Sequence, residues 1–136
     1  MGRAPTGRVV SITPMPPAVR ALRGATTVDR DSPEQIGART VELLTEMFER
    51  NDVGHDDLIS ILFTVTEDLV SAFPAAAART IGLGDVPLLC AREIPVPNSM
   101  ARCVRVLAHL TTGRSRSEMH HVYLHAAVGL RDDLPA

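Results

Sequence analysis

Arginine and acidic side chains on predicted strands are the residues of this chain whose types suit ligand chemistry. Arg23 lies between Ala21 and Ala25 on one face of a predicted strand, because side chains two residues apart share a face. Small neighbours leave room for a ligand beside a guanidinium, which stays charged and offers a rigid fork of donors. Arg105 lies on a later predicted strand, and Glu93 lies near the end of another. By pattern alone, such side chains are most often solvated or paired in salt bridges.

Histidine and cysteine suggest two other sites, a metal centre and a disulfide. His120, His121 and His125 lie close together, but no cysteine or carboxylate partner stands at ligand spacing, so we expect no metal. Cys90 and Cys103 are two in number, which permits one pair. Without a secretory signal we expect both to be reduced, and most often such cysteines are small buried side chains.

Composition excludes several classes of function. The 136 residues are 45% hydrophobic and 22% charged, which is typical of one globular domain. The net charge of -2 and the pI of about 6.2 provide no basic field for nucleic acid or an anionic membrane. No apolar run approaches the ~20 residues of a membrane span, and the N-terminus lacks the apolar segment of a secretory signal. We therefore expect a cytoplasmic protein that meets an anionic small molecule with a few placed arginines.

The elements that must position these side chains begin after a short extension. Residues 1–17 contain several prolines and no hydrophobic period, which indicates a flexible extension. Residues 18–27 predict a strand. Ser32 as N-cap and Pro33 at the first helical position predict a helix start, and apolar side chains at helical spacing continue it to about Arg50.

The rest of the chain predicts a second, shorter helix and further strands. Strands are predicted over residues 58–66, 86–93 and 102–110, and a helix is predicted over residues 73–82. The apolar segment 120–130 predicts a short fifth strand or a docking tail. This order predicts one α/β (α+β sandwich) domain over residues 18–136, in which helices pack on one face of a mixed sheet.

Five motifs occur along these elements in a specific order. They are RALRGATTVDRD at residues 20–31, FPA at 73–75 followed by Arg79, CARE at 90–93, RCVR at 102–105 and HVYL at 121–124. Together they resemble the small α/β homotrimeric chorismate mutases, over about residues 18–134. The resemblance implies an isomerase that converts chorismate to prephenate by a pericyclic (Claisen) rearrangement, in phenylalanine and tyrosine biosynthesis. It also implies a trimeric pseudo-barrel with active sites between subunits.

The resemblance also implies roles for the matched residues. Arg23 and Tyr123 would bind a substrate carboxylate, and Arg105 would lie beside the ether oxygen of the breaking bond. Glu93 and the region of Cys90 would hold the substrate ring and its hydroxyl. Cys90 and Glu93 are three residues apart, so a regular strand directs them to opposite faces. A shared site requires a bulge, or a strand end near residue 92.

Other matched positions are expected to border the same cleft. Phe73 and Arg79 would come from the neighbouring subunit, and the position of Leu89 also borders the family's cleft. The chain departs from the family at Ala76, where a lysine can stand, and at Leu89, where a polar residue can stand. Both departures concern the rim of the cleft and not its central charges.

The implied chemistry explains why arginine and glutamate are the expected catalytic types. Chorismate is a dianion, and its rearrangement transfers no proton, so no cofactor, nucleophile or metal is required. Negative charge develops on the ether oxygen, and a fixed guanidinium beside it stabilises that charge. Clamped carboxylates hold the substrate in its reactive conformation.

Two alternatives come from other classes. A small imine or enamine deaminase on a similar trimeric fold also has a strand arginine in its cleft, but the pair Arg23 and Arg105 suits a dicarboxylate better. A non-catalytic trimeric module could bind an anionic metabolite. Glu93 argues against that module, because a carboxylate beside an anion weakens binding unless it serves a specific hydroxyl.

Overall fold

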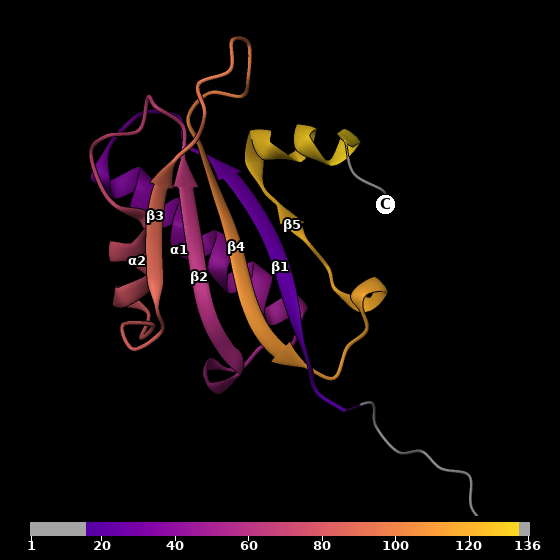
Figure 1. Cartoon of the computed structure of the whole chain (residues 1–136). Coiled ribbons are helices and arrows are strands. Elements are labelled where there is room, and N and C mark those ends of the chain that lie inside the picture. Colours follow the sequence, from indigo (N-terminus) through magenta and orange to yellow (C-terminus); the bar gives the residue numbers. More distant parts are fainter. Residues whose placement is uncertain (1–15, 134–136) are drawn as a thin grey trace, which may run out of the picture.

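The computed structural model describes residues 16–133, in which five strands form one sheet (Figure 1). The strands are β1 (Ala18–Thr27), β2 (Leu58–Val65), β3 (Leu88–Arg92), β4 (Cys103–Thr112) and β5 (Val122–Tyr123). The helices are α1 (Pro33–Arg50) and α2 (Pro74–Thr80), with 3-10 helices η1 (His55–Asp57), η2 (Arg116–Glu118) and η3 (His125–Asp133). The predicted extension, residues 1–17, lies outside the described residues except for its last two.

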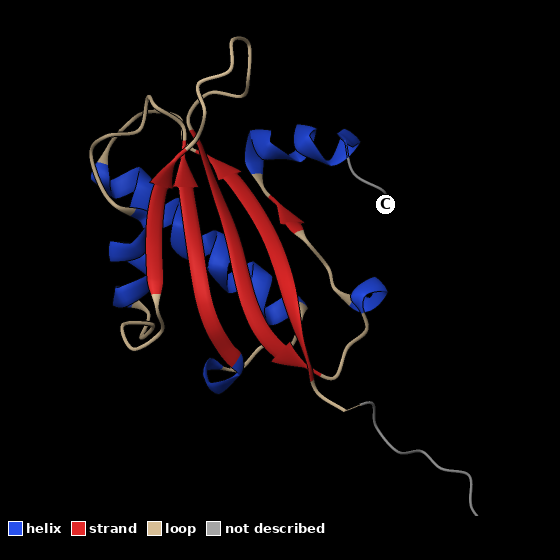
Figure 2. Ribbon diagram, in the orientation of Figure 1, coloured by secondary structure: helices blue, strands red, loops and turns tan. Residues whose placement is uncertain are grey.

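The sheet is mixed and is covered by the two α-helices on one face. Its strand order is β3-β2-β4-β1-β5. β4 is antiparallel to both β1 and β2, whereas β3 is parallel to β2 and β5 is parallel to β1. Figure 2 shows α1 and α2 together behind the strands. The predicted α+β sandwich with helices on one face of a mixed sheet is therefore confirmed.

Helix α1 begins and ends where its sequence predicts. The Ser32 hydroxyl accepts the Gln35 N–H at 3.1 Å, and Pro33 occupies the first turn, where its missing N–H has no intrahelical partner. One face of the helix is buried against the sheet through Ile36, Thr40, Leu43, Leu44 and Met47. Its other face is polar, and no helix within residues 16–133 is long and apolar enough to cross a membrane.

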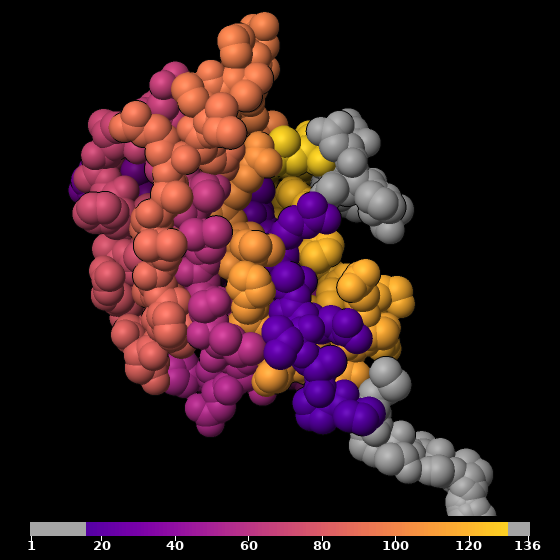
Figure 3. Space-filling model, in the orientation of Figure 1, coloured from indigo at the N-terminus to yellow at the C-terminus, as the bar shows by residue number. Residues whose placement is uncertain are grey.

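Alternation along the strands separates a core face from an open face. From Val104 to Leu110 in β4, the buried side chains face the helices, and Arg105 and Leu107 between them face the opposite side. In β2, Phe63 is buried beneath the helices while Thr64 faces away. Viewed from this open side, the side chains of β1, β2 and β4 lie at the surface (Figure 3). The β4 side chains buried beneath the helices are Val104, Val106, Ala108 and Leu110, and Cys103 is buried in a separate cluster with Ala25 and Ala127.

Helix α2, Pro74–Thr80, is slightly shorter than the helix predicted over residues 73–82, and two strands differ more from the prediction. Val86 is buried in a turn, where its N–H donates to the Leu83 carbonyl at 3.1 Å, so β3 begins only at Leu88. β5 pairs with β1 at Val122 and Tyr123 only, and the chain then continues as η3. Residues 120–130 were predicted to form either a short strand or a docking tail. They contain a short strand, β5, and then η3 in the place of the tail.

Gly24 provides a test of how closely β1 packs on α1. A Cβ added at Gly24 would collide with Met47 Sδ and lie 3.1 Å from Leu43 Cδ1. Gly24→Ala should therefore lower the free energy of unfolding by about 1–3 kcal/mol, because overpacking displaces these side chains. Gly37→Ala is the matched control: its Cβ would meet nothing within 4 Å. That change should raise the unfolding free energy by about 0.5–1 kcal/mol. Urea denaturation measures both, and an undiminished value for Gly24→Ala would contradict the packing.

Candidate active site

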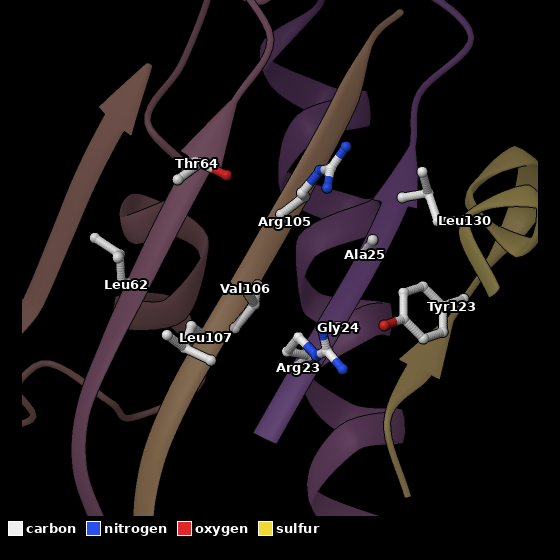
Figure 4. Close-up of a pocket in the computed structure, with 10 residues that line it drawn as sticks. All are labelled: Arg23, Gly24, Ala25, Leu62, Thr64, Arg105, Val106, Leu107, Tyr123 and Leu130. Carbon is white, nitrogen blue, oxygen red and sulfur yellow. The ribbon is translucent and has the colours of Figure 1, made fainter. Parts of the chain in front are cut away.

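The open face of the sheet contains a cavity of about 330 Å³ above β1, β2 and β4 (Figure 4). β5 and η3 border it on the β1 side. A cavity of this size suits a small organic ligand. Its lining residues are Arg23, Gly24, Ala25, Leu62, Thr64, Arg105, Val106, Leu107, Tyr123 and Leu130.

A network of three side chains holds Arg105 over this cavity. The Nε of Arg105 lies 3.0 Å from Oε2 of Glu93, and the Thr64 hydroxyl donates to the same oxygen at 2.6 Å. The Glu93 side chain is 19% exposed and that of Arg105 is 43% exposed, so the carboxylate is shielded while the guanidinium stays accessible. Because the ion pair uses Nε, the two terminal nitrogens of Arg105 are left for an anionic ligand.

Strand register explains why these three residues meet. Arg105 on the central strand β4 is the cross-strand partner of Thr64 on β2. β3 ends at Arg92, but the Glu93 N–H still donates to the Val65 carbonyl at 2.9 Å. Glu93 therefore continues the alternation of β3 by one residue. Its side chain reaches the open face, next to Arg105.

Arg23 and Tyr123 border the other side of the cavity. Tyr123 is the register partner of Ala25, and Figure 4 shows its hydroxyl directed toward β1, on the side of Arg23. The backbone N–H of Arg23 donates to Nδ1 of His121 at 3.0 Å. Burial lowers the pKa of His121, and the neighbouring Arg23 and His120 lower it further. Both effects favour the neutral imidazole, whose unprotonated Nδ1 can accept the hydrogen bond from Arg23.

A small apolar cluster closes the cavity near Arg105. Cys103, Ala25 and Ala127 are buried in it, and Leu130 packs against them. Burial raises the pKa of Cys103 to about 11, and the nearby Arg105 opposes this shift only in part. The thiol therefore stays neutral at physiological pH. An apolar, uncharged wall preserves the electrostatic field of the Arg105 guanidinium, because it does not screen it as water would.

Five of the predicted site residues are not part of the cavity lining, and of these only Glu93 adjoins it, through its contacts with Arg105 and Thr64. Phe73 precedes α2 and is 72% exposed, and Arg79 is exposed in the last turn of that helix. Leu89 is 65% exposed on β3, the edge strand. Cys90 packs against the core on the helix-covered face, whereas Glu93 reaches the open face. One chain thus unites the two arginines, the glutamate and the tyrosine, and it separates the Cys90 side chain from Glu93.

Thr64 lines the cavity and contacts Glu93, and it is not among the residues that the sequence predicts for the site. It fixes the carboxylate of Glu93 through the bond described above, and Leu62 and Leu107 line the cavity beside it. Alternation along residues 58–66 places Leu62 and Thr64 on the face opposite Phe63. The missing information was the pairing of β2 with β4, which no local pattern contains.

The arrangement suits electrostatic chemistry on an anion. Two guanidinium groups on neighbouring strands, those of Arg23 and Arg105, can bind two anionic oxygen sites of one ligand. Glu93 can accept a hydrogen bond from a ligand hydroxyl, because the bonds from Thr64 and Arg105 both use its Oε2. Within residues 16–133, no group of three or more His, Cys, Asp or Glu side chains is arranged to hold a metal ion.

Comparisons with known proteins agree on one family. Residues 19–134 match the family model described as chorismate mutase type I. The chain is 54% identical to chorismate mutase AroH of Thermus thermophilus over 117 residues, which cover 85% of this chain and 96% of that protein. It is 38% identical to chorismate mutase AroH of Bacillus subtilis over 117 residues, 85% of this chain and 92% of that protein. The solved structure of a chorismate mutase from Clostridium thermocellum superposes with a TM-score of 0.80 at 47% identity, covering 81% of this chain and 98% of that one. The chain therefore belongs to the type I chorismate mutase family.

Proposed function

We propose that this chain isomerises chorismate to prephenate in the cavity over β1, β2 and β4, with Arg105 and Glu93 as catalytic residues. The observation that carries the proposal is the network in which Thr64 and Arg105 share one oxygen of Glu93. It holds a guanidinium and a carboxylate side by side at fixed positions over a ligand-sized cavity. The family match and the relatives support the same reaction, which belongs to aromatic amino-acid biosynthesis.

Arg105 supplies the largest catalytic effect in this mechanism. During the rearrangement the C–O bond of the ether breaks while a C–C bond forms, and negative charge accumulates on the ether oxygen. The terminal nitrogens of Arg105 donate to that oxygen, and the ion pair with Glu93 fixes them beforehand. Preorganised charge of this kind requires no rearrangement of the site as the reaction proceeds.

Glu93 acts on the opposite charge. The ring fragment becomes positive as the ether oxygen becomes negative, so a carboxylate near the ring stabilises it. One oxygen of Glu93 is held by Thr64 and Arg105, and the other accepts a hydrogen bond from the ring hydroxyl. The same carboxylate therefore orients both the substrate and the catalytic arginine.

Arg23 and Tyr123 bind a carboxylate of the substrate at the β1 side of the cavity. Chorismate is flexible, and only a compact, chair-like conformation reacts. Anchoring a carboxylate to Arg23 while the ether oxygen meets Arg105 selects that conformation and removes much of the entropic cost of reaching it. No cofactor takes part in this scheme, since no proton, hydride or electron is transferred.

A homotrimer would complete the cavity with residues that one chain keeps apart. Phe73, Leu89 and Ile94 are large apolar side chains that are 72%, 65% and 82% exposed, which is typical of surfaces that another subunit covers. They lie at or beside the β3 edge. If that edge meets the cleft of the next chain, Phe73 and Arg79 reach the substrate there. The Cys90 thiol faces the core, so in this scheme Cys90 contributes packing and backbone contacts only.

The two alternative functions account for less of the site. A deaminase does not explain why two arginines line one cavity and why one of them is paired with a carboxylate. A binding module does not explain why a carboxylate stands beside an anion site. The matched family model and the 54% identical relative favour the mutase over both.

Substitutions at Arg105 test its role in the transition state. Arg105→Ala should lower kcat by about 10²–10³, with a smaller change in KM, because it removes a preorganised donor that acts on developing charge. Arg105→Lys should recover part of the loss, since it keeps the charge but not the fork. Arg50→Ala, at an exposed ion pair on α1, is the matched control and should change neither constant. Loss of chorismate absorbance gives both values. An Arg105→Ala enzyme with raised KM and unchanged kcat would refute the assignment.

Mixed oligomers test the shared cavity. Light scattering should give the mass of a trimer of the 14.6 kDa chain. Arg79→Ala and Arg105→Ala chains, each nearly inactive alone, should regain activity when unfolded and refolded together, because some interfaces then combine an intact Arg79 with an intact Arg105. Refolding each variant alone is the control. An active monomer, or a mixture without recovered activity, would contradict shared sites.

A further inference from the structure

Asn51 has a buried side chain whose hydrogen-bonding groups are all used. It is the C-cap of α1 and is 1% exposed. Its Oδ1 accepts the N–H of His120 at 2.7 Å, and its Nδ2 donates to the carbonyls of His120 and Met47, both at 2.8 Å. A buried amide in this position satisfies three backbone groups that would otherwise lack partners.

The contact of Asn51 with His120 resembles the pairing of two strands. Both the N–H and the carbonyl of His120 are bound, so the Asn51 side chain replaces the backbone of a neighbouring strand. The two residues are 69 positions apart in the sequence. Val122 and Tyr123, which form β5, follow two and three residues after His120. Asn51 thus fixes the point at which the chain enters β5.

β5 needs such an anchor because its own pairing is short. It pairs with β1 only at Gly24↔Val122 and Ala25↔Tyr123. Beyond β5, the N–H of Leu124 donates to the carbonyl of Ala25 at 2.9 Å. A slip of one residue in a strand turns each side chain to the opposite face. A two-residue strand that must present a tyrosine to the cavity therefore depends on contacts at both of its ends.

We propose that Asn51 is a positioning residue for Tyr123, which acts by clamping the backbone of His120 and thereby fixes the Tyr123 hydroxyl beside Arg23. This inference rests on the proposed function, in which Tyr123 and Arg23 bind a substrate carboxylate. Asn51 is not among the residues that line the cavity, and its contacts lie at the C-terminal end of α1. Its effect on catalysis passes through β5.

Asn51→Asp isolates the clamp, because it keeps the shape of the side chain and removes both donors. A carboxylate oxygen would then face the carbonyls of Met47 and His120, which repel it. We expect KM for chorismate to rise on the order of tenfold, the scale of coupling within one network. We expect kcat to change much less, because Arg105 and Glu93 are held by other strands.

A double-mutant cycle with Tyr123→Phe distinguishes positioning from general destabilisation. Tyr123→Phe removes the hydroxyl itself, so Asn51→Asp should have little further effect on KM in that background. We expect the effect of Asn51→Asp on KM to shrink by at least about threefold there. Loss of stability alone lowers the amount of active enzyme and therefore the maximal rate, and it leaves KM unchanged in both backgrounds.

Controls keep the outcome decisive. Asn98→Asp makes the same chemical change in an exposed turn and should leave KM unaltered. If Asn51→Asp does not fold, the same cycle is measured with Asn51→Ser, which is neutral and too short to reach His120. Additive effects, or an unchanged KM in the folded Asn51 variant, would overturn the inference. Absence of chorismate turnover by the wild-type chain would instead overturn the proposed function.

Discussion

The shared oxygen of Glu93 is the contact on which the candidate site depends. Oε2 lies 2.6 Å from the Thr64 hydroxyl and 3.0 Å from Nε of Arg105, so three strands meet at one atom. An unpaired arginine side chain on a strand would sample many rotamers. Fixing it on a ligand would then cost conformational entropy. Here the ion pair restrains the guanidinium in advance while its terminal nitrogens stay accessible. Exposed ion pairs contribute little to stability, so we regard this one as serving orientation.

The two faces of the sheet differ in burial, and this difference leaves Arg105 accessible. The helix-covered face contains the main core, where Phe63, Leu22 and Leu110 are fully buried beneath α1 and α2. Stability comes chiefly from that burial. The open face is consequently free to expose charged groups and to keep a cavity. β4 at the centre of the sheet supplies Arg105, and its two neighbours supply Arg23 and Thr64.

Local patterns predicted most of the fold. The bounds of β1 and the start of α1 at Pro33 agree with the structure, because proline, an N-cap serine and alternation act within a few residues. The bounds of β3 and β5 were predicted less accurately, because both strands are shorter than the apolar segments that contain them. Val86 is apolar because a turn buries it, and a short apolar run does not distinguish such a turn from a strand.

The sequence predicts only those site residues that can be identified from their own type and the motif around them. Arg23, Arg105, Glu93 and Tyr123 were identified through the family resemblance, and one chain brings them to one region. The role of Thr64 depends on the register of β2 with β4, and that of Asn51 depends on a contact 69 residues away. Residue spacing along the sequence reveals neither the strand register nor this long-range contact. The same limit applies to Phe73 and Arg79, whose expected contacts lie in another subunit.

Neutralising the Glu93 carboxylate tests whether its charge holds Arg105 in the arrangement that catalysis requires. Glu93→Gln keeps the size of the side chain and a partner for the Thr64 hydroxyl, but it removes the charge that holds Arg105 and faces the ring. The turnover number of Glu93→Gln with chorismate should fall by at least about tenfold, because the guanidinium loses its charge-assisted partner. The free energy of unfolding should change little, since the pair is partly exposed. A Glu93→Gln enzyme with wild-type kcat would contradict the account.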